Sequence, residues 1–307
     1  MKKKQWFASL LTVVALLSLT ACGGAPAPAE APVPEARGKE TLDLDGIAVT
    51  KDWCDDIPVI YIEPAAPAGG RKLAIFLSGL SGTKEAQAPY LKDIADMGYV
   101  ALSFDLYQHG ERGNESKQEI MARVFSNMRR YGWPILGQTA LDTERVVDWA
   151  IGNLGVEPEF YMGGISMGGD ITMTVAGMDP RLVRGAPVVT TPDWLRPGMH
   201  DLENPSEILD PGTPDSYAQY FYDNFNPITH LDRYVDCPPM RLTLGEEDNH
   251  IPPENAERFR TQLAALSPEA AQRIEIHYVS GPEANHRDVI GRKDEWWPDL
   301  KEWWLGQ

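Results

Sequence analysis

Positive charge and cysteine are both scarce in this sequence. Its 307 residues include 28 Lys and Arg against 45 Asp and Glu, which gives a formal net charge of −17. Such a polyanion is not drawn to nucleic acid or to anionic lipid headgroups, so we expect no nucleic-acid partner. Three cysteines are too few for a disulfide scaffold. The chain also lacks a Cys/His metal spacing, a P-loop and a dinucleotide fingerprint, so we expect no metal and no cofactor.

The N-terminal apolar run is too short to favour a membrane span. It extends from Trp6 to Leu19 and follows three lysines at positions 2–4. A basic start, a short apolar run and a small-residue exit are typical of a secretory signal. We therefore expect residues 1–21 to be a signal peptide and the protein to be exported.

The end of this run resembles the lipobox of bacterial lipoproteins, in which the cysteine becomes the lipidated first residue. The residues concerned are Leu19-Thr20-Ala21-Cys22-Gly23. The resemblance implies an extracytoplasmic protein anchored to a bacterial membrane by lipid on Cys22. An ordinary cleaved signal with a chance cysteine is the alternative. Residues 22–40 are rich in Pro and Ala and poor in apolar side chains that could pack, so we interpret them as an extended tether.

The remaining residues, 41–307, carry the alternation of an α/β domain. Apolar or β-branched runs predict strands at 57–62, 73–77, 99–104, 160–162, 186–190, 240–244 and 274–279. Amphipathic patterns predict helices at 85–97, 139–154, 167–178, 253–266 and 294–305. Short strands that alternate with helices favour right-handed crossovers. We predict one α/β domain with a doubly wound, mostly parallel sheet.

A G-x-S-x-G pattern lies between a predicted strand and a predicted helix. It is part of the sequence GGISMGG at residues 163–169. In a nucleophile elbow the serine occupies a sharp turn, and glycines two residues away on either side let the strand and helix pass closely. We take Ser166 as the candidate nucleophile. The Met167 amide, at the start of the next helix, is a natural donor to an oxyanion. A tight turn without catalysis is the alternative.

Four segments together resemble the α/β-hydrolase superfamily, and more narrowly the small bacterial esterases related to dienelactone hydrolases and to prolyl-oligopeptidase-like catalytic domains. They read FLSGL at 76–80, FDLYQHGER at 104–112, the elbow, and LGEEDNHIP at 244–252. The resemblance spans about residues 57–305 and implies a second oxyanion donor at the Leu80 amide. Two positions depart from the pattern: dienelactone hydrolases carry Cys where this chain has Ser166, and many relatives have His-Gly where it has Ser78-Gly79.

The base and the acid follow from chain order, which in this fold is Ser, then Asp or Glu, then His. His286 lies in a polar loop after the last predicted strand, where the family places its base. Asp248 matches the family's acid position, and Asp193 after the preceding strand is the competing choice. We expect His109 to tie its loop beneath the site by hydrogen bonds, and His250 to lie at the surface.

A Pro-rich and aromatic stretch at 191–227 is expected to form a partial cap over the site, because a long irregular insertion in a compact domain is usually functional. Trp194 is our candidate for a wall of the substrate pocket. The C-terminal tryptophans 296, 297, 303 and 304 recur with helical spacing and are interpreted as a core face. Cys54 and Cys237 are either bridged or buried free thiols.

The function that these residues favour is an extracytoplasmic, lipid-anchored serine hydrolase. We expect a carboxylesterase that acts on a small-molecule, short-acyl ester through Ser166, Asp248 and His286 and an acyl-enzyme. One alternative is a prolyl-oligopeptidase-like peptidase, although a propeller domain does not fit before residue 57. The other is a non-catalytic lipoprotein that binds a ligand.

Overall fold

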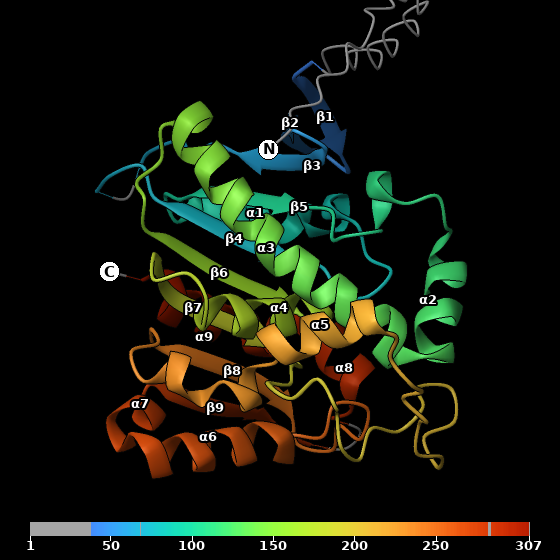
Figure 1. The fold of residues 1–307 in the computed structure, drawn as a ribbon. Helices are drawn as coiled ribbons and strands as arrows, with labels where there is room; N and C mark the ends of the chain where they lie inside the picture. The colour runs from blue at the N-terminus through green and yellow to red at the C-terminus, as the bar shows by residue number, and fades with distance from the viewer. Residues whose placement is uncertain (1–37, 68, 282–283, 307) are drawn as a thin grey trace, which may run out of the picture. The chain divides into compact units, whose positions relative to one another are not determined.

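The computed structural model describes residues 38–67, 69–281 and 284–306. The expected signal peptide, Cys22 and the tether up to residue 37 lie outside this part. Within it, nine strands form a single sheet in the order β1-β2-β3-β5-β4-β6-β7-β8-β9 (Figure 1). Their bounds are β1 Glu40–Leu44, β2 Ile47–Cys54, β3 Ile57–Ile62, β4 Leu73–Leu77, β5 Val100–Phe104, β6 Phe160–Ile165, β7 Leu182–Val188, β8 Met240–Gly245 and β9 Ile274–Val279.

The sheet is antiparallel at one edge and parallel elsewhere. Strands β1, β2, β3 and β5 pair antiparallel, and from β5 through β4, β6, β7 and β8 to β9 each pair is parallel. The predicted fold class is therefore confirmed. The β1–β2 hairpin was not predicted. Its turn, Asp45-Gly46, has positive φ at both residues, which is the Asp-Gly signature of a tight hairpin and could have been recognised.

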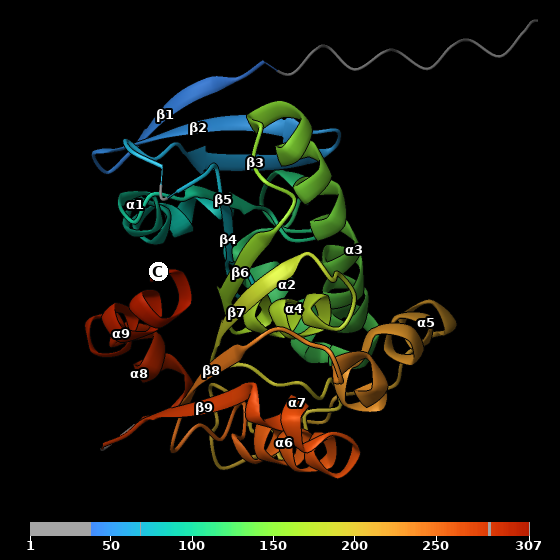
Figure 2. The same ribbon diagram turned by 90° about the vertical axis from the view of Figure 1, so that its left-hand side faces the viewer.

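Helices cover both faces of the sheet (Figure 2). They are α1 Ala88–Asp96, α2 Lys117–Ser126, α3 Met128–Leu154, α4 Met167–Ala176, α5 Ser216–Phe225, α6 Glu254–Leu266, α7 Pro268–Gln272, α8 His286–Gly291 and α9 Lys293–Leu305, with short 3₁₀ turns η1 Lys84–Gln87, η2 Gly110–Arg112, η3 Pro227–Thr229 and η4 Leu231–Tyr234. One apolar core lies between the sheet and α3, α4 and α6, and a second lies between the sheet and α1 and α9. The predicted tryptophan face belongs to this second core, where Trp296, Trp297 and Trp304 are buried.

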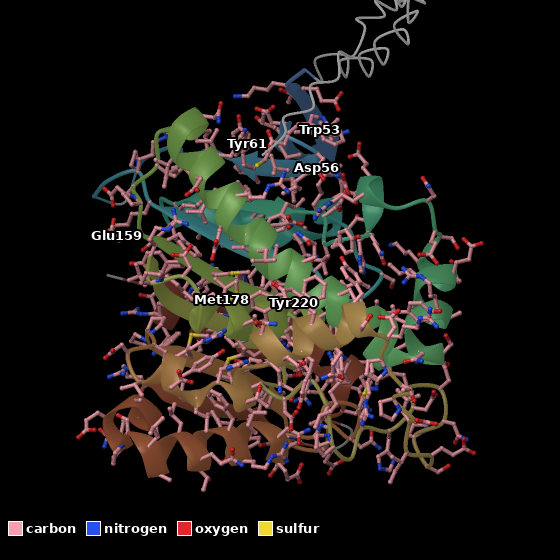
Figure 3. The ribbon with its side chains drawn as sticks, in the orientation of Figure 1. Trp53, Asp56, Tyr61, Glu159, Met178 and Tyr220 are labelled. Carbon is pink, nitrogen blue, oxygen red and sulfur yellow. The ribbon has the colours of Figure 1, made fainter. Side chains whose placement is uncertain are left out.

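Helix α3 begins eleven residues before its predicted start because Gly and Pro obscure its first turns. Asn127 caps it by accepting a hydrogen bond from the Arg130 amide, and Pro134 lies inside it. A Cβ on Gly137 would lie 2.2 Å from the Phe221 ring, so the glycine lets α5 pack closely on α3. Tyr217 and Tyr220 of α5 face outward, and Tyr220 is 55% exposed (Figure 3).

Cys54 and Cys237 are both buried and unbridged. Among the described residues, no helix combines the length and the apolar character that crossing a membrane requires.

Candidate active site

Ser166 occupies a strained turn between β6 and α4. Its φ of 53° and ψ of −114° are unusual for a residue with a side chain, and such strain persists only where the surroundings impose it. The Ser166 amide donates to the Val188 carbonyl at 2.8 Å, and the Asp170 amide donates to the Ser166 carbonyl at 2.9 Å. The serine is thus held between the neighbouring strand β7 and the first turn of α4.

Gly164 and Gly168, which flank Ser166, are required because other backbone segments approach them closely. A Cβ on Gly164 would lie 2.7 Å from the carbonyl carbon of Gly168, and a Cβ on Gly168 would lie 2.6 Å from the Ser78 carbonyl oxygen. No side chain fits at either position. The elbow pattern in the sequence therefore reflects three backbone segments that meet behind Ser166.

His286, the first residue of α8, bridges Ser166 and Asp248. Its Nδ1 lies 2.9 Å from Asp248 Oδ2, and its Nε2 lies 3.0 Å from Ser166 Oγ. A carboxylate only accepts hydrogen bonds, so Nδ1 carries the hydrogen and Nε2 accepts from the serine hydroxyl. Asp248 lies 82 residues after Ser166 and His286 lies 38 residues after Asp248, yet the three side chains form one hydrogen-bonded series.

Backbone donors hold the other oxygen of Asp248. Its Oδ1 accepts from the amides of His250 at 3.0 Å and Ile251 at 2.8 Å, and the residue is 2% exposed. Charged acceptors of this kind make strong hydrogen bonds. The carboxylate is therefore fixed in orientation and directs the imidazole of His286 toward Ser166.

The loop after β4 lies against the elbow. A Cβ placed on Gly79 would lie 3.3 Å from the Cβ of Ser166. The loop turns tightly, because the Gly82 amide donates to the Gly79 carbonyl at 3.0 Å and Ser81 has a φ of 64°. Leu80 and Met167, the two expected oxyanion donors, both belong to segments that line the cavity at Ser166.

This cavity has a volume of about 330 Å³ and mostly apolar walls. Its apolar lining consists of Leu80, Met121, Phe125, Met128, Ile165, Met167, Leu202 and Ile290. Helix α2, which supplies two of these side chains, was not predicted. Its start carries a capping box in which Ser116 and Glu119 exchange hydrogen bonds, and the S-x-x-E pattern at 116–119 was a usable signal.

A buried ion pair forms another part of the wall. Arg196 lines the cavity and pairs with Asp170, one turn after Ser166 on α4. Asp170 also accepts hydrogen bonds from the Thr190 hydroxyl at 2.9 Å and from the Thr191 amide at 2.7 Å. Burial raises the pKa of the Asp170 carboxyl. The pair ties the segment after β7 to the helix that carries the serine.

Of the expected cap, residues Arg196 and Leu202 reach the cavity, whereas α5 packs on α3. The expectation for Trp194 is wrong: it is 1% exposed and belongs to the apolar core rather than to the cavity wall. Its amide donates to Asn226 Oδ1 and its carbonyl accepts from Trp133 Nε1, so its backbone is fixed beside α3.

The side chains of Asp193, His109 and His250 are not part of the hydrogen-bonded series at Ser166. Asp193 pairs with Arg258 and accepts from the Leu195 amide, away from His286. His109 is buried, and its Nδ1 lies 3.0 Å from the Tyr107 carbonyl. Burial lowers the pKa of His109 to about 4, so it is neutral at pH 7. His250 is not at the surface: it is 4% exposed and lines the cavity.

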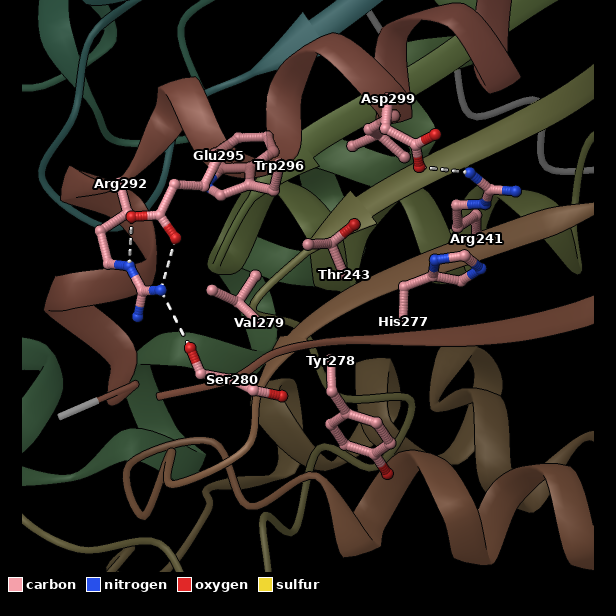
Figure 4. Close-up of a pocket in the computed structure, with 11 residues that line it drawn as sticks. Arg241, Thr243, His277, Tyr278, Val279, Ser280, Arg292, Glu295, Trp296 and Asp299 are labelled. Carbon is pink, nitrogen blue, oxygen red and sulfur yellow. Dashed lines mark hydrogen bonds and ion pairs between the residues drawn. The ribbon is translucent and has the colours of Figure 1, made fainter. Parts of the chain in front are cut away.

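A separate hollow of about 240 Å³ lies between β8, β9 and α9 (Figure 4). Its charged groups pair with one another. Arg241 meets Asp299 at 3.0 Å, while Arg292 meets Glu295 and the Ser280 carbonyl. We therefore place the candidate site at Ser166 and not in this hollow.

Known proteins resemble this chain in sequence. Residues 137–305 match the model of the prolyl oligopeptidase family. A Salmonella typhimurium protein named "putative carboxymethylenebutenolidase" is 24% identical over 268 residues, which cover 82% of this chain and 86% of that protein. A Mycobacterium tuberculosis protein named "probable carboxylic ester hydrolase LipM" is 24% identical over 233 residues, 69% of this chain and 47% of that protein.

Solved structures share the fold. The Thermus thermophilus protein TT1662 matches with a TM-score of 0.59 at 21% identity, over 88% of this chain and 98% of that one. The chain has the α/β-hydrolase fold and hydrolases are among its relatives, so it is a hydrolase. Because the family match extends over more than half of its length, the chain belongs to the prolyl oligopeptidase family.

Proposed function

We propose that this protein is a serine carboxylesterase in which Ser166 is the nucleophile, His286 the general base and Asp248 the acid that orients the base. The observation that carries the proposal is the hydrogen-bonded series of these three side chains, with distances of 3.0 and 2.9 Å, at a strained elbow beside a cavity. A base that already accepts from the serine hydroxyl is placed to remove its proton.

The reaction follows from this arrangement. Ser166 Oγ attacks the ester carbonyl while His286 Nε2 takes the hydroxyl proton, and Asp248 stabilises the resulting imidazolium. The amides of Leu80 and Met167 hold the oxyanion of the tetrahedral intermediate. The imidazolium returns its proton to the departing alcohol, which leaves an acyl-enzyme. Water then attacks the acyl group by the same steps, and the carboxylic acid is released.

A short acyl group fits the size of the cavity. About 330 Å³ with apolar walls accommodates a small ester, and a long chain that cannot enter would hold its carbonyl badly. The names of the Salmonella and Mycobacterium relatives support an ester or lactone substrate over a peptide. We further propose that lipid on Cys22 anchors the enzyme outside the cytoplasm.

Labelling with a fluorophosphonate tests the nucleophile. We expect the probe to label the native protein and the control Ser126→Ala, whose serine is exposed on α2, and not Ser166→Ala. The Ser166→Ala variant should lose on the order of 10³-fold or more in kcat on p-nitrophenyl butyrate. A Ser166→Ala protein that keeps a tenth of the activity would contradict the assignment.

A series of p-nitrophenyl esters of graded acyl length tests the substrate class. We expect acetyl to butyryl esters to have a higher kcat/KM than decanoyl esters. Hydrolysis of aminoacyl anilides with no turnover of any ester would instead assign a peptidase.

A further inference from the structure

A second imidazole lies directly against the proposed base. The rings of His250 and His286 meet edge to face, with centroids 4.9 Å apart. The His250 ring also lies edge to face with Phe125 of α2, with centroids 5.8 Å apart. The His250 amide donates to Asp248, which fixes its backbone within the acid loop. His250 therefore belongs to the same cluster as the three proposed catalytic side chains.

The protonation of His250 follows from its partners. Its Nδ1 lies 2.8 Å from the His200 carbonyl, and a carbonyl only accepts, so Nδ1 carries the hydrogen. Burial, and next the neighbouring His286, lowers the pKa of His250 to about 3. The ring is neutral at pH 7, and its Nε2 is a lone-pair acceptor that does not take up a proton.

This acceptor is open to the cavity region. Within the described ranges Nε2 has no hydrogen-bond partner, and it is not one of the fully buried polar atoms that lack one. The His250 ring lines both the cavity at Ser166 and an adjoining hollow of about 430 Å³. The two spaces also share Leu202, His286 and Arg287. The accessible acceptor therefore belongs to a residue that lines the space beside Ser166.

Two more polar side chains in this cavity lack partners. Ser78 and Gln87 are 1% and 5% exposed, and neither Ser78 Oγ nor Gln87 Oε1 has a hydrogen-bond partner in the part of the chain that the structure describes. Both residues belong to the cavity lining, but these two atoms are covered by protein. Ser78 Oγ and Gln87 Oε1 are therefore not offered to a ligand, in contrast to His250 Nε2.

We propose that His250 is a specificity residue whose Nε2 accepts a hydrogen bond from a free hydroxyl group carried by the substrate beside its ester. The proposal rests on the ester hydrolase function above. It names the substrate class as hydroxylated esters, which are either partly acylated polyols or esters of hydroxy acids. The hydroxyl group donates to His250 Nε2, whereas an unsubstituted alkyl ester leaves this acceptor unpaired.

Matched pairs of esters test the proposal on the native enzyme. Comparison of glycerol 1-monobutyrate with propyl butyrate tests a hydroxyl group on the alcohol side of the ester. Comparison of methyl 3-hydroxybutyrate with methyl butyrate tests one on the acyl side. We expect a kcat/KM at least on the order of tenfold higher for the hydroxylated member of one pair, because its hydroxyl group pairs with an acceptor that the unsubstituted ester leaves unpaired. The pair that shows the preference identifies the side.

Variants assign the preference to His250. His250→Phe keeps the ring against His286 but has no acceptor, and His250→Gln keeps an amide oxygen near the position of Nε2. We expect the ratio of kcat/KM within the preferred pair to fall to near one in His250→Phe and to stay above that in His250→Gln. Met121→Leu, an apolar control in the same cavity, should change both esters of a pair by the same factor. General damage to the fold also lowers both esters alike, so the ratio isolates the hydrogen bond.

Equal kcat/KM within both pairs on the native enzyme would overturn the subsite, and so would an unchanged ratio in a His250→Phe protein that remains active. This failure differs from failure of the esterase function, because an enzyme that is no esterase would turn over none of the four esters and would not react with the fluorophosphonate. The native-enzyme comparison stays decisive if a variant does not fold.

Discussion

At the residue scale, two carboxylates at neighbouring strand ends have opposite surroundings. Asp248 accepts two backbone amides on one oxygen and the His286 ring on the other. Asp193 is equally buried, but its partner is Arg258. A carboxylate whose charge is already matched by a guanidinium, and which lies away from the imidazole, does not orient the base. The choice between them depends on what each one contacts and not on its burial.

Replacement of each carboxylate by its amide separates these roles. Asp248→Asn should lower kcat on p-nitrophenyl butyrate on the order of 10³-fold or more, because an amide at this position favours the wrong tautomer of His286. Asp193→Asn should change kcat by less than about tenfold and lower the thermal midpoint, since Arg258 loses its partner. If kcat collapses in Asp193→Asn and survives in Asp248→Asn, the acid is the earlier residue.

At the element scale, a buried ion pair anchors the loop that carries the proposed oxyanion donor. Lys84 opens η1 directly after this loop, and its fully buried Nζ lies 2.9 Å from Asp105 Oδ2 and 2.6 Å from Glu111. The Lys84 amide also donates to Asp105. Burial alone would lower the pKa of the Lys84 ammonium, but the surrounding carboxylates raise it above its usual value. The lysine is therefore charged, and it holds η1 to the end of β5.

Removal of this charge should loosen the loop. We expect Lys84→Met to lower the free energy of unfolding by about 3–5 kcal/mol, because it leaves Asp105 buried without its cation. The kcat should fall as well, since Gly79 and Leu80 would no longer be held against Ser166. Lys92→Met is the matched control: this lysine is half exposed in an i,i+4 pair with Asp96, and its loss should change stability by less than about 0.5 kcal/mol. Denaturant unfolding measures the stability of each variant, and an ester hydrolysis assay measures kcat. Equal stability of Lys84→Met and Lys92→Met would contradict the role of Lys84 in holding the loop.

At the scale of the whole molecule, the candidate site and the proposed lipid anchor belong to different parts of the sequence. The residues of the candidate site lie from Ser78 onward, and the proposed lipidated residue is Cys22. With a formal net charge of −17, the protein gains little from electrostatic attraction to an anionic membrane, so attachment would depend on the lipid.

The anchor is tested by one substitution. Cys22→Ser should move the enzyme from the membrane fraction to the soluble fraction and leave kcat on p-nitrophenyl butyrate within about twofold, because Ser166, Asp248 and His286 lie far along the chain from Cys22. Fractionation and mass spectrometry of the mature N-terminus are the measurements. An unmodified N-terminus at a residue other than Cys22 would show that the signal is of the ordinary cleaved kind.

Local sequence was sufficient for the parts of this protein that depend on neighbours along the chain. The runs at 57–62 and 73–77 have the bounds of β3 and β4, because strands covered on both faces are continuously apolar. The run at 274–279, which includes Glu275 and His277, has the bounds of the edge strand β9. The elbow at Ser166 was recognisable because its glycines are needed for local backbone approach. Chain order, with the family resemblance, also selected Asp248 and His286, which the fold brings into contact.

Only the tertiary structure decided which side chains surround the serine. His250 and Trp194 both follow strand ends in polar or Pro-rich loops, where sequence predicts exposure for one and a pocket wall for the other. The fold buries His250 against His286 and buries Trp194 in the apolar core. Helix α2, which sequence patterning missed, supplies part of the cavity wall. These outcomes depend on contacts between segments far apart in the chain, and no local pattern of hydrophobicity encodes the direction in which a loop side chain points.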